Sequence, residues 1–179
     1  MIDPVIGALL AGSFALLFAG AALHKLLDPA RFGEVFSAYA VVPRALAWLA
    51  PAVPLLELTV AAALLVRGSR AGAAAAGAAL LMTYAAAIAI NLARGRHDLT
   101  CGCGGPNDRR PIAAWMVWRN LGLALLLGVS VLPWSSRPLE GADALTIGMG
   151  TAVIGLLYMS FELLLGRLQP SIARLPGAP

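Results

Sequence analysis

The sequence contains few charged residues, only two cysteines and only two histidines. Of its 179 residues, 12% are charged and 60% are hydrophobic, a composition too apolar for an ordinary soluble domain. Two cysteines are too few for a disulfide-rich secreted scaffold, and so small a set of Cys and His disfavours a closed zinc site within one chain. The segment 1–4, before the first apolar run, has no Lys or Arg, so we expect a retained helix there and not a signal peptide. These features indicate an integral membrane protein.

Long apolar runs predict the membrane-spanning helices. Crossing ~30 Å of hydrocarbon takes roughly 20 helical residues, and five runs approach that length: 5–23, 46–66, 72–92, 112–132 and 145–165. The predicted fold is an all-α membrane protein, a bundle of about five transmembrane helices with a four-helix core plus one. We expect a single domain over 1–169 and a tail at 170–179.

A short amphipathic helix is predicted at 29–42, after the first span. Its apolar side chains recur at helical spacing, and it would lie in the interface or pack over the mouth of the bundle. They are Phe32, Val35, Phe36 and Tyr39. The net charge of +4 arises in short loops, where lipid headgroups or an acidic protein would meet the basic side chains, so we expect no nucleic-acid partner.

The most distinctive segment is the polar loop between the third and fourth spans, where Cys101 and Cys103 flank Gly102. A disulfide across one residue closes too small a loop to stabilise a fold, whereas a strained small ring is readily reduced or exchanged. The pair therefore predicts thiol–disulfide exchange, and the chain would then be a membrane thiol-disulfide oxidoreductase. Nearby guanidinium groups would favour the reactive thiolate; they belong to Arg94, Arg96, Arg109 and Arg110.

Two alternatives to a redox dithiol stay open. Two close thiolates also suit Cu(I) or Hg(II), and His97 could add a third ligand to Cys101 and Cys103, as in a soft-metal transporter. The other alternative is a non-catalytic assembly scaffold, in which replacing the cysteines would be harmless.

Ionisable residues inside the predicted spans form a second candidate feature. Glu57 lies near the middle of the second span and Arg119 about two turns into the fourth. Such charges are costly in a membrane unless they are paired, so we predict that these two form a buried ion pair. Asn120 and Tyr84 could complete its hydrogen bonds, and Glu162 is expected to snorkel or cap a helix.

The amphipathic helix and the cysteine loop both follow odd-numbered spans, so both emerge on one face of the membrane. Several polar residues are predicted on or near this thiol side: His24, Lys25, Arg31, Asn91, Arg94, Arg96, His97, Arg109 and Arg110.

Several of these motifs together resemble the MauE family of methylamine utilisation proteins, relatives of the DoxX-like small membrane proteins. The resemblance covers essentially the whole chain. It is carried by 22–26 before Asp28-Pro29, by Tyr39, Pro43 and Glu57, by 84–91, by Arg94-Gly95-Arg96, by Cys101-Gly102-Cys103-Gly104-Gly105, and by 115–120.

The resemblance implies an accessory protein of the bacterial inner membrane that helps methylamine dehydrogenase small subunit to mature, working beside a thioredoxin-like disulfide protein. It implies Cys101 and Cys103 as the reacting pair. The expected supporting residues are Lys25, Glu57, Asn91, Arg94, Arg96, His97 and Arg119. Analogy with quinone-linked disulfide-forming membrane proteins suggests a quinone as electron acceptor.

The charge distribution conflicts with that role. Nine Lys and Arg residues fall on the thiol side and three on the other, and the positive-inside rule would place the side with more of them in the cytoplasm. Disulfide chemistry on an exported client needs the periplasmic face. We predict the periplasmic face, because arginines beside a thiol site also serve its chemistry.

Overall fold

The computed structural model describes residues 3–101, 110–131 and 137–172. Within this part of the chain all the regular elements are helices, apart from one isolated β-bridge. The elements are α1 (Pro4–Leu27), α2 (Pro29–Ala38), the 3-10 helix η1 (Arg44–Leu49), α3 (Ala52–Leu65), α4 (Arg70–Ala93), α5 (Ala114–Val129) and α6 (Gly141–Ile172).

Among the described residues, four segments are long and apolar enough to cross a membrane: Pro4–Leu27, Ala45–Leu65, Arg70–Ala93 and Gly141–Leu165. The fourth predicted span, 112–132, is realised as the shorter α5, whose 16 residues extend ~24 Å at ~1.5 Å per residue. It starts later than predicted because Ala113 is extended and the Ile112 amide bonds to the Leu99 carbonyl. The chain is therefore a multi-pass membrane protein whose α5 is shorter than a full span.

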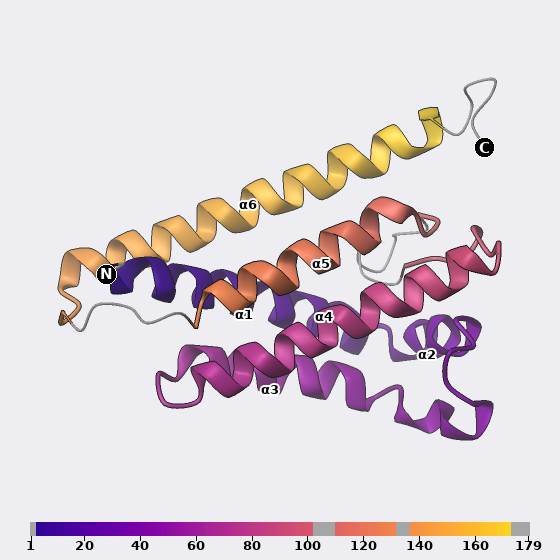
Figure 1. Cartoon of the computed structure of the whole chain (residues 1–179), viewed down its shortest axis with the longest axis horizontal. Helices are drawn as coiled ribbons and strands as arrows, with labels where there is room; N and C mark the ends of the chain where they lie inside the picture. Colours follow the sequence, from indigo (N-terminus) through magenta and orange to yellow (C-terminus); the bar gives the residue numbers. More distant parts are fainter. Residues whose placement is uncertain (1–2, 102–109, 132–136, 173–179) are drawn as a thin grey trace.

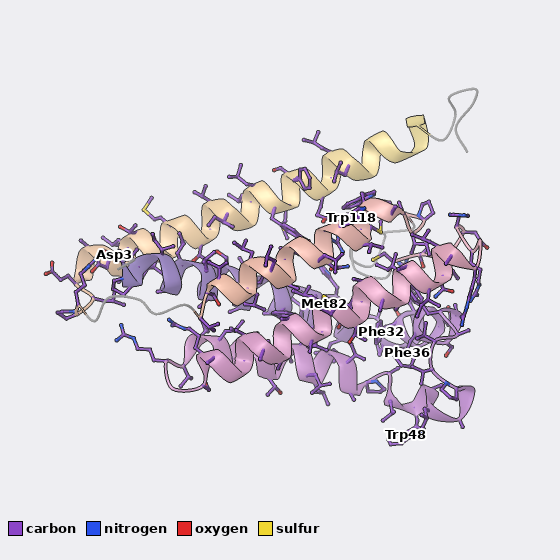
Figure 2. The ribbon with its side chains drawn as sticks, viewed as in Figure 1. Asp3, Phe32, Phe36, Trp48, Met82 and Trp118 are labelled. Carbon is purple, nitrogen blue, oxygen red and sulfur yellow. The ribbon has the colours of Figure 1, made fainter. Side chains whose placement is uncertain are left out.

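The second predicted span is interrupted near its start. The 3-10 helix η1 ends at Leu49 and α3 begins at Ala52; Pro51 lies between them, and proline has no amide to donate to a continuous helix. Trp48 of η1 and Trp118 of α5 are 71% and 72% exposed, and Trp48 points away from the bundle (Figure 2). Such outward aromatic side chains suit the lipid and its headgroup boundary.

The predicted amphipathic helix is confirmed as α2, although it ends at Ala38 and not at 42. Asp28 caps its start by accepting a bond from the Arg31 amide, and the left-handed φ of 48° at Ala40 turns the chain away from its end. The α2 helix packs over the mouth of the bundle: the Phe32 ring lies 5.6 Å from the Lys25 ammonium, and Tyr39 packs against Ile88 and its neighbours.

Four helices build the core and α6 flanks it, as predicted (Figure 1). The α1 helix packs against α3 and α6, and α4 packs against α3 and α5. Phe18, Leu64 and Leu127 are fully buried in the core cluster. A Cβ at Gly77 would lie 2.8 Å from Leu127 Cδ2 and 2.9 Å from Phe18 Cε2, so only glycine permits α4 to approach this closely.

The α6 helix runs parallel to α1 and contacts it through small residues. A Cβ at Gly12 of α1 would lie 2.9 Å from Thr151 Oγ1 of α6, and a Cβ at Gly155 would lie 2.9 Å from Leu16 Cδ2. Small residues at these positions allow close backbone approach where lipid provides no hydrophobic driving force.

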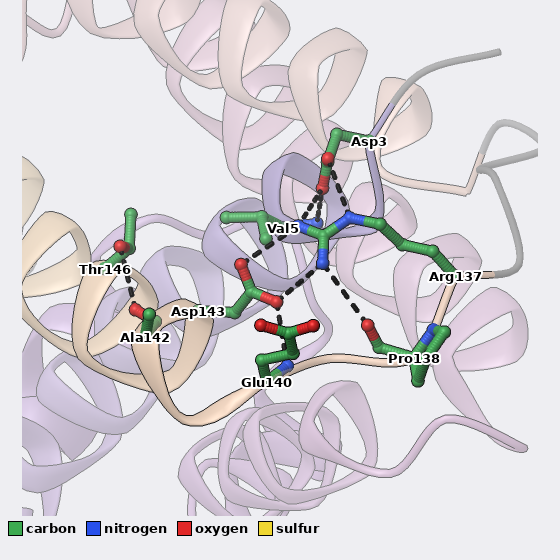
Figure 3. Close-up of polar contacts among 8 residues, drawn as sticks. All are labelled: Asp3, Val5, Arg137, Pro138, Glu140, Ala142, Asp143 and Thr146. Atoms are coloured by element: carbon green, nitrogen blue, oxygen red, sulfur yellow. Dashed lines mark hydrogen bonds and ion pairs between the residues drawn. The ribbon is translucent and has the colours of Figure 1, made fainter.

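A guanidinium group joins the starts of α1 and α6 at one end of the bundle (Figure 3). Arg137 Nε donates to Asp3 Oδ2 at 3.0 Å and Arg137 Nη1 donates to Asp143 Oδ2 at 2.7 Å. Asp3 also caps α1 by accepting the Val5 amide at 2.9 Å. The hydrogen bond from Arg137, with that from the Val5 amide, lowers the pKa of Asp3. We call Asp3, Arg137 and Asp143 the clasp, and the opposite end of the bundle, which carries Cys101, the thiol end.

Candidate functional site at the thiol end

Cys101 lies on the neck of the polar loop. Thr100 and Pro111 form the antiparallel β-bridge, and the Ile112 amide donates to the Leu99 carbonyl at 2.8 Å, so the two strands of the loop meet just outside the bundle. The Cys101 side chain is half-buried and packs against the apolar cluster of Ile88, Ile112 and Met116. The neck therefore fixes one predicted thiol against the ends of α4 and α5.

The second thiol of the predicted pair, Cys103, lies outside the described residues, as does Arg109. Pairing of Cys101 with Cys103 remains a prediction.

The predicted supporting residues of α4 contact α2. The Asn91 side chain, fully buried, donates to the Tyr39 carbonyl at 3.0 Å and accepts a bond from Arg96 Nη1 at 2.9 Å. Arg96 Nη2 donates to the Ala38 carbonyl at 2.7 Å. Carbonyls at a helix end lack intrahelical partners and carry negative partial charge, so these residues attach the end of α2 to the thiol loop.

Arg94 has the same role, since its Nη1 donates to the Ala40 carbonyl at 3.3 Å. The structure thus gives Arg94 and Arg96 hydrogen bonds to backbone carbonyls of the α2 end. These bonds direct two of the guanidinium groups that were predicted to stabilise the thiolate toward carbonyls at the end of α2.

The metal alternative gains no ligand group from the described residues. His97 is exposed on the loop, and the part of the chain that the structure describes contains no group of three His, Cys, Asp or Glu residues able to hold a metal ion. A site that includes Cys103 falls outside that part.

Glu57 pairs with Lys25 and not with Arg119, so the predicted ion pair is wrong. Lys25 Nζ donates to both Glu57 oxygens at 2.6 and 2.7 Å, and the Tyr84 hydroxyl donates to Glu57 Oε1 at 2.7 Å. Lys25 is 6% exposed and Glu57 is fully buried. The predicted hydrogen bond from Tyr84 is confirmed, and the three residues form a triad among α1, α3 and α4, in which Lys25 and Glu57 are buried and Tyr84 is half-buried.

Arg119 pairs with Glu162 of α6, which corrects the expectation that Glu162 snorkels or caps. Arg119 Nη1 donates to Glu162 Oε1 at 2.7 Å, and its guanidinium lies 5.4 Å from the Trp115 ring centre. Arg110 Nη1 donates to the Glu162 backbone carbonyl at 2.7 Å. Arg119 does not pair with Glu57 because α5 packs mainly on α4, whereas the Glu57 side chain bonds to Lys25 of α1.

The triad shares one level of the bundle with Asn120. Lys25, Glu57, Tyr84 and Asn120 each lie seven residues, two helical turns, toward the thiol end from the core residues that meet at Gly77. Asn120 is 3% exposed, and its Nδ2 has no hydrogen-bond partner among the described residues. The Trp115 Nε1, which lies nearer to the start of α5, is also buried without a hydrogen-bond partner among the described residues. Two buried donor atoms on α5 therefore have no acceptor among the described residues.

Known proteins are similar to this chain over most of its length. The family model described as methylamine utilisation protein MauE matches residues 3–133, which include α1 to α5 and the thiol loop. The chain belongs to the MauE family. A MauE protein of Methylophilus methylotrophus is 36% identical over 92% of this chain and 88% of its own length. MauE proteins of Paracoccus denitrificans and Paracoccus versutus are each 38% identical, over 93% and 98% of this chain and 90% and 96% of their own lengths. No solved structure matches.

The MauE match includes the triad and the neck, but ends before α6. Sequence reasoning missed Arg110 and Glu162 as partners and assigned the wrong partner to Glu57. The available signal was that Glu57 and Glu162 are the two carboxylates within the predicted spans, so Glu162 was the alternative partner for Arg119.

Proposed function

We propose that this MauE-family chain is a membrane thiol–disulfide exchange protein that acts in methylamine utilisation, on the small subunit of methylamine dehydrogenase, together with a thioredoxin-like protein. The observation that supports this best is the position of Cys101: a half-buried thiol on a bridged neck, packed against Ile112 and Met116. A site on rigid elements holds a reacting group in place better than a free loop does.

The proposed chemistry balances between two dithiol–disulfide pairs. A thiolate of one pair attacks a sulfur of the other pair's disulfide, which forms a mixed disulfide and releases a thiolate that takes up a proton. The remaining thiol of the first pair, having lost its proton, then attacks the mixed disulfide. One pair, Cys101 and Cys103 or the partner's, is oxidised to a disulfide; the other is reduced by two electrons and gains two protons.

Net disulfide formation also needs a two-electron acceptor, for which we propose a quinone. The Asn120 Nδ2 and Trp115 Nε1 donors fit the hydrogen-bond acceptors of a quinone headgroup, because each is buried with no partner among the described residues. These two residues would hold the carbonyl oxygens, and the quinone would supply two-electron oxidation from the lipid phase.

The test is replacement of each cysteine. Cys101→Ser and Cys103→Ser should each abolish maturation of the client while the protein remains in the membrane. Thr146→Ala, at the clasp end, is the matched control, because its hydroxyl bonds only to the Ala142 carbonyl among the contacts described. Normal client activity in both serine variants would refute exchange and favour a scaffold; stoichiometric Cu or Hg on the purified protein, lost in both variants, would favour metal handling.

The proposal places the thiol loop in the periplasm. A membrane-impermeant maleimide added to whole cells after mild reduction should label Cys101 and Cys103. Labelling only after the cells are opened would place the loop in the cytoplasm and exclude an exported client.

A further inference from the structure

The α6 helix has two different attachments to the rest of the bundle. Toward its start it follows α1 through Gly12, Thr151 and Gly155. None of its described side chains is fully buried. Nearer its other end, described hydrogen bonds from α5 and the thiol-loop neck reach it at Glu162.

Glu162 connects to two points on the segment that supports Cys101. Its carboxylate accepts Arg119 Nη1 at 2.7 Å, and its backbone carbonyl accepts Arg110 Nη1 at 2.7 Å, with 3.8 Å from that nitrogen to Glu162 Oε2. The side chains of Arg119 and Glu162 are only 12% and 14% exposed. In a poorly hydrated setting such charge-assisted bonds are strong and directional.

The two arginines lie in sequence on either side of two residues against which Cys101 packs. Arg110 directly precedes the bridge residue Pro111, and Arg119 lies on α5 one turn beyond Trp115. Ile112 and Met116, against which Cys101 packs, lie between them in sequence. Displacement of this segment would remove one wall of the Cys101 environment.

We propose that Glu162 is a positioning residue for Cys101: through Arg110 and Arg119, α6 holds the apolar wall that keeps this thiol half-buried. Glu162 itself lies outside the part of the chain that the family model matches, which ends at residue 133, whereas Cys101, Arg110 and Arg119 lie within it. Its meaning for catalysis rests on the proposed thiol exchange, but the geometry can be tested without it.

The test measures how fast Cys101 reacts. In a Cys103→Ser background Cys101 is the sole cysteine. The rate of its alkylation by a maleimide, measured over a pH series and taken at full ionisation of the thiol, reports its exposure. Glu162→Gln in purified protein in lipid nanodiscs should raise this rate roughly tenfold, which corresponds to about 1.4 kcal/mol of lost restraint.

Asp143→Asn is the matched control, because it neutralises one carboxylate of an ion pair on the same helix at the clasp end. It should leave the alkylation rate within about twofold. Arg110→Gln removes the hydrogen bond to the Glu162 backbone carbonyl, which Glu162→Gln leaves in place. It should therefore also raise the rate, and it serves as the test if Glu162→Gln does not accumulate.

An unchanged Cys101 alkylation rate in both Glu162→Gln and Arg110→Gln, with lowered thermal midpoints, would show that Glu162 supports only the stability of the fold. That result would overturn the proposal. The outcome is separable from that of the proposed function. If Glu162→Gln raises the rate while Cys101→Ser still supports client maturation, the positioning role stands and the exchange function falls.

Discussion

The two ends of the bundle use the same chemical groups in different surroundings. At the clasp end, Arg137 bridges Asp3 and Asp143, with Arg137 and Asp3 39% and 46% exposed. At the thiol end, the side chains of Lys25 and Glu57 are 6% and 0% exposed. An ion pair in water contributes little, whereas breaking a buried one leaves an uncompensated charge. The fold therefore buries an ion pair at the thiol end and leaves the ion pairs of the clasp partly exposed.

The largest effect is expected from Glu57→Gln, which leaves the Lys25 ammonium buried without its counter-ion. The thermal unfolding midpoint in detergent should fall strongly, corresponding to ~3–5 kcal/mol. Replacing both partners, as Lys25→Met with Glu57→Leu, should cost less than the single change. Equal losses in the single and double variants would contradict the pairing.

A double-mutant cycle between Glu57 and Arg119 sharpens the same point. Because these residues have different partners, Glu57→Gln and Arg119→Gln should add to within ~0.5 kcal/mol in unfolding free energy. A larger coupling would mean that the two charges interact after all.

A smaller loss is expected at the third member of the triad. Tyr84→Phe removes one donor to Glu57 Oε1 while both bonds from Lys25 remain, so we expect a loss of ~1–2 kcal/mol. The thermal midpoint measures it, and Met82→Leu, an exposed apolar position on the same helix, is the control. A midpoint equal to that of the control would show that the hydroxyl does not support the carboxylate.

The smallest effect belongs to the clasp, where it should depend on pH. The hydrogen bonds from Arg137 and the Val5 amide lower the pKa of Asp3 in the folded protein. The carboxylate therefore stabilises the fold above its unfolded pKa of ~3.9, and this contribution is lost as pH falls through the lower folded value. The midpoint difference between the wild type and Asp3→Asn should be constant near neutral pH and shrink below about pH 4. A difference that grows on acidification would have the wrong sign.

The elements of the fold could largely be predicted from the sequence, because apolar length, Pro29 and the spacing of the α2 apolar face act locally. The ion-pair partners of the buried charged residues depended on where the helices end, which the sequence did not show. The first apolar run suggests an end near residue 23, but α1 continues to Leu27, which keeps Lys25 inside the bundle. Likewise the predicted span 145–165 places Glu162 near its end, but α6 continues to Ile172. Glu162 therefore lies well inside the helix, where it pairs with Arg119.

The depth of a charge could be estimated from the sequence, but the direction in which it points could not. Glu57 and Arg119 were correctly placed inside the bundle, yet their helix faces depend on which helices are neighbours, and α5 packs mainly on α4. The bonds from Arg94 and Arg96 to the α2 end could not be predicted either, because they depend on the turn at Ala40.

The most direct test of a reacting thiol at this end is trapping of the mixed disulfide. Cells that express Cys101→Ser or Cys103→Ser would be quenched in acid, and the membrane protein analysed by non-reducing electrophoresis and mass spectrometry. We predict a reductant-sensitive adduct with a thioredoxin-like protein in at least one variant, and none when both cysteines are replaced. Absence of any adduct in both variants, together with normal maturation of the client, would contradict thiol exchange at Cys101 and Cys103.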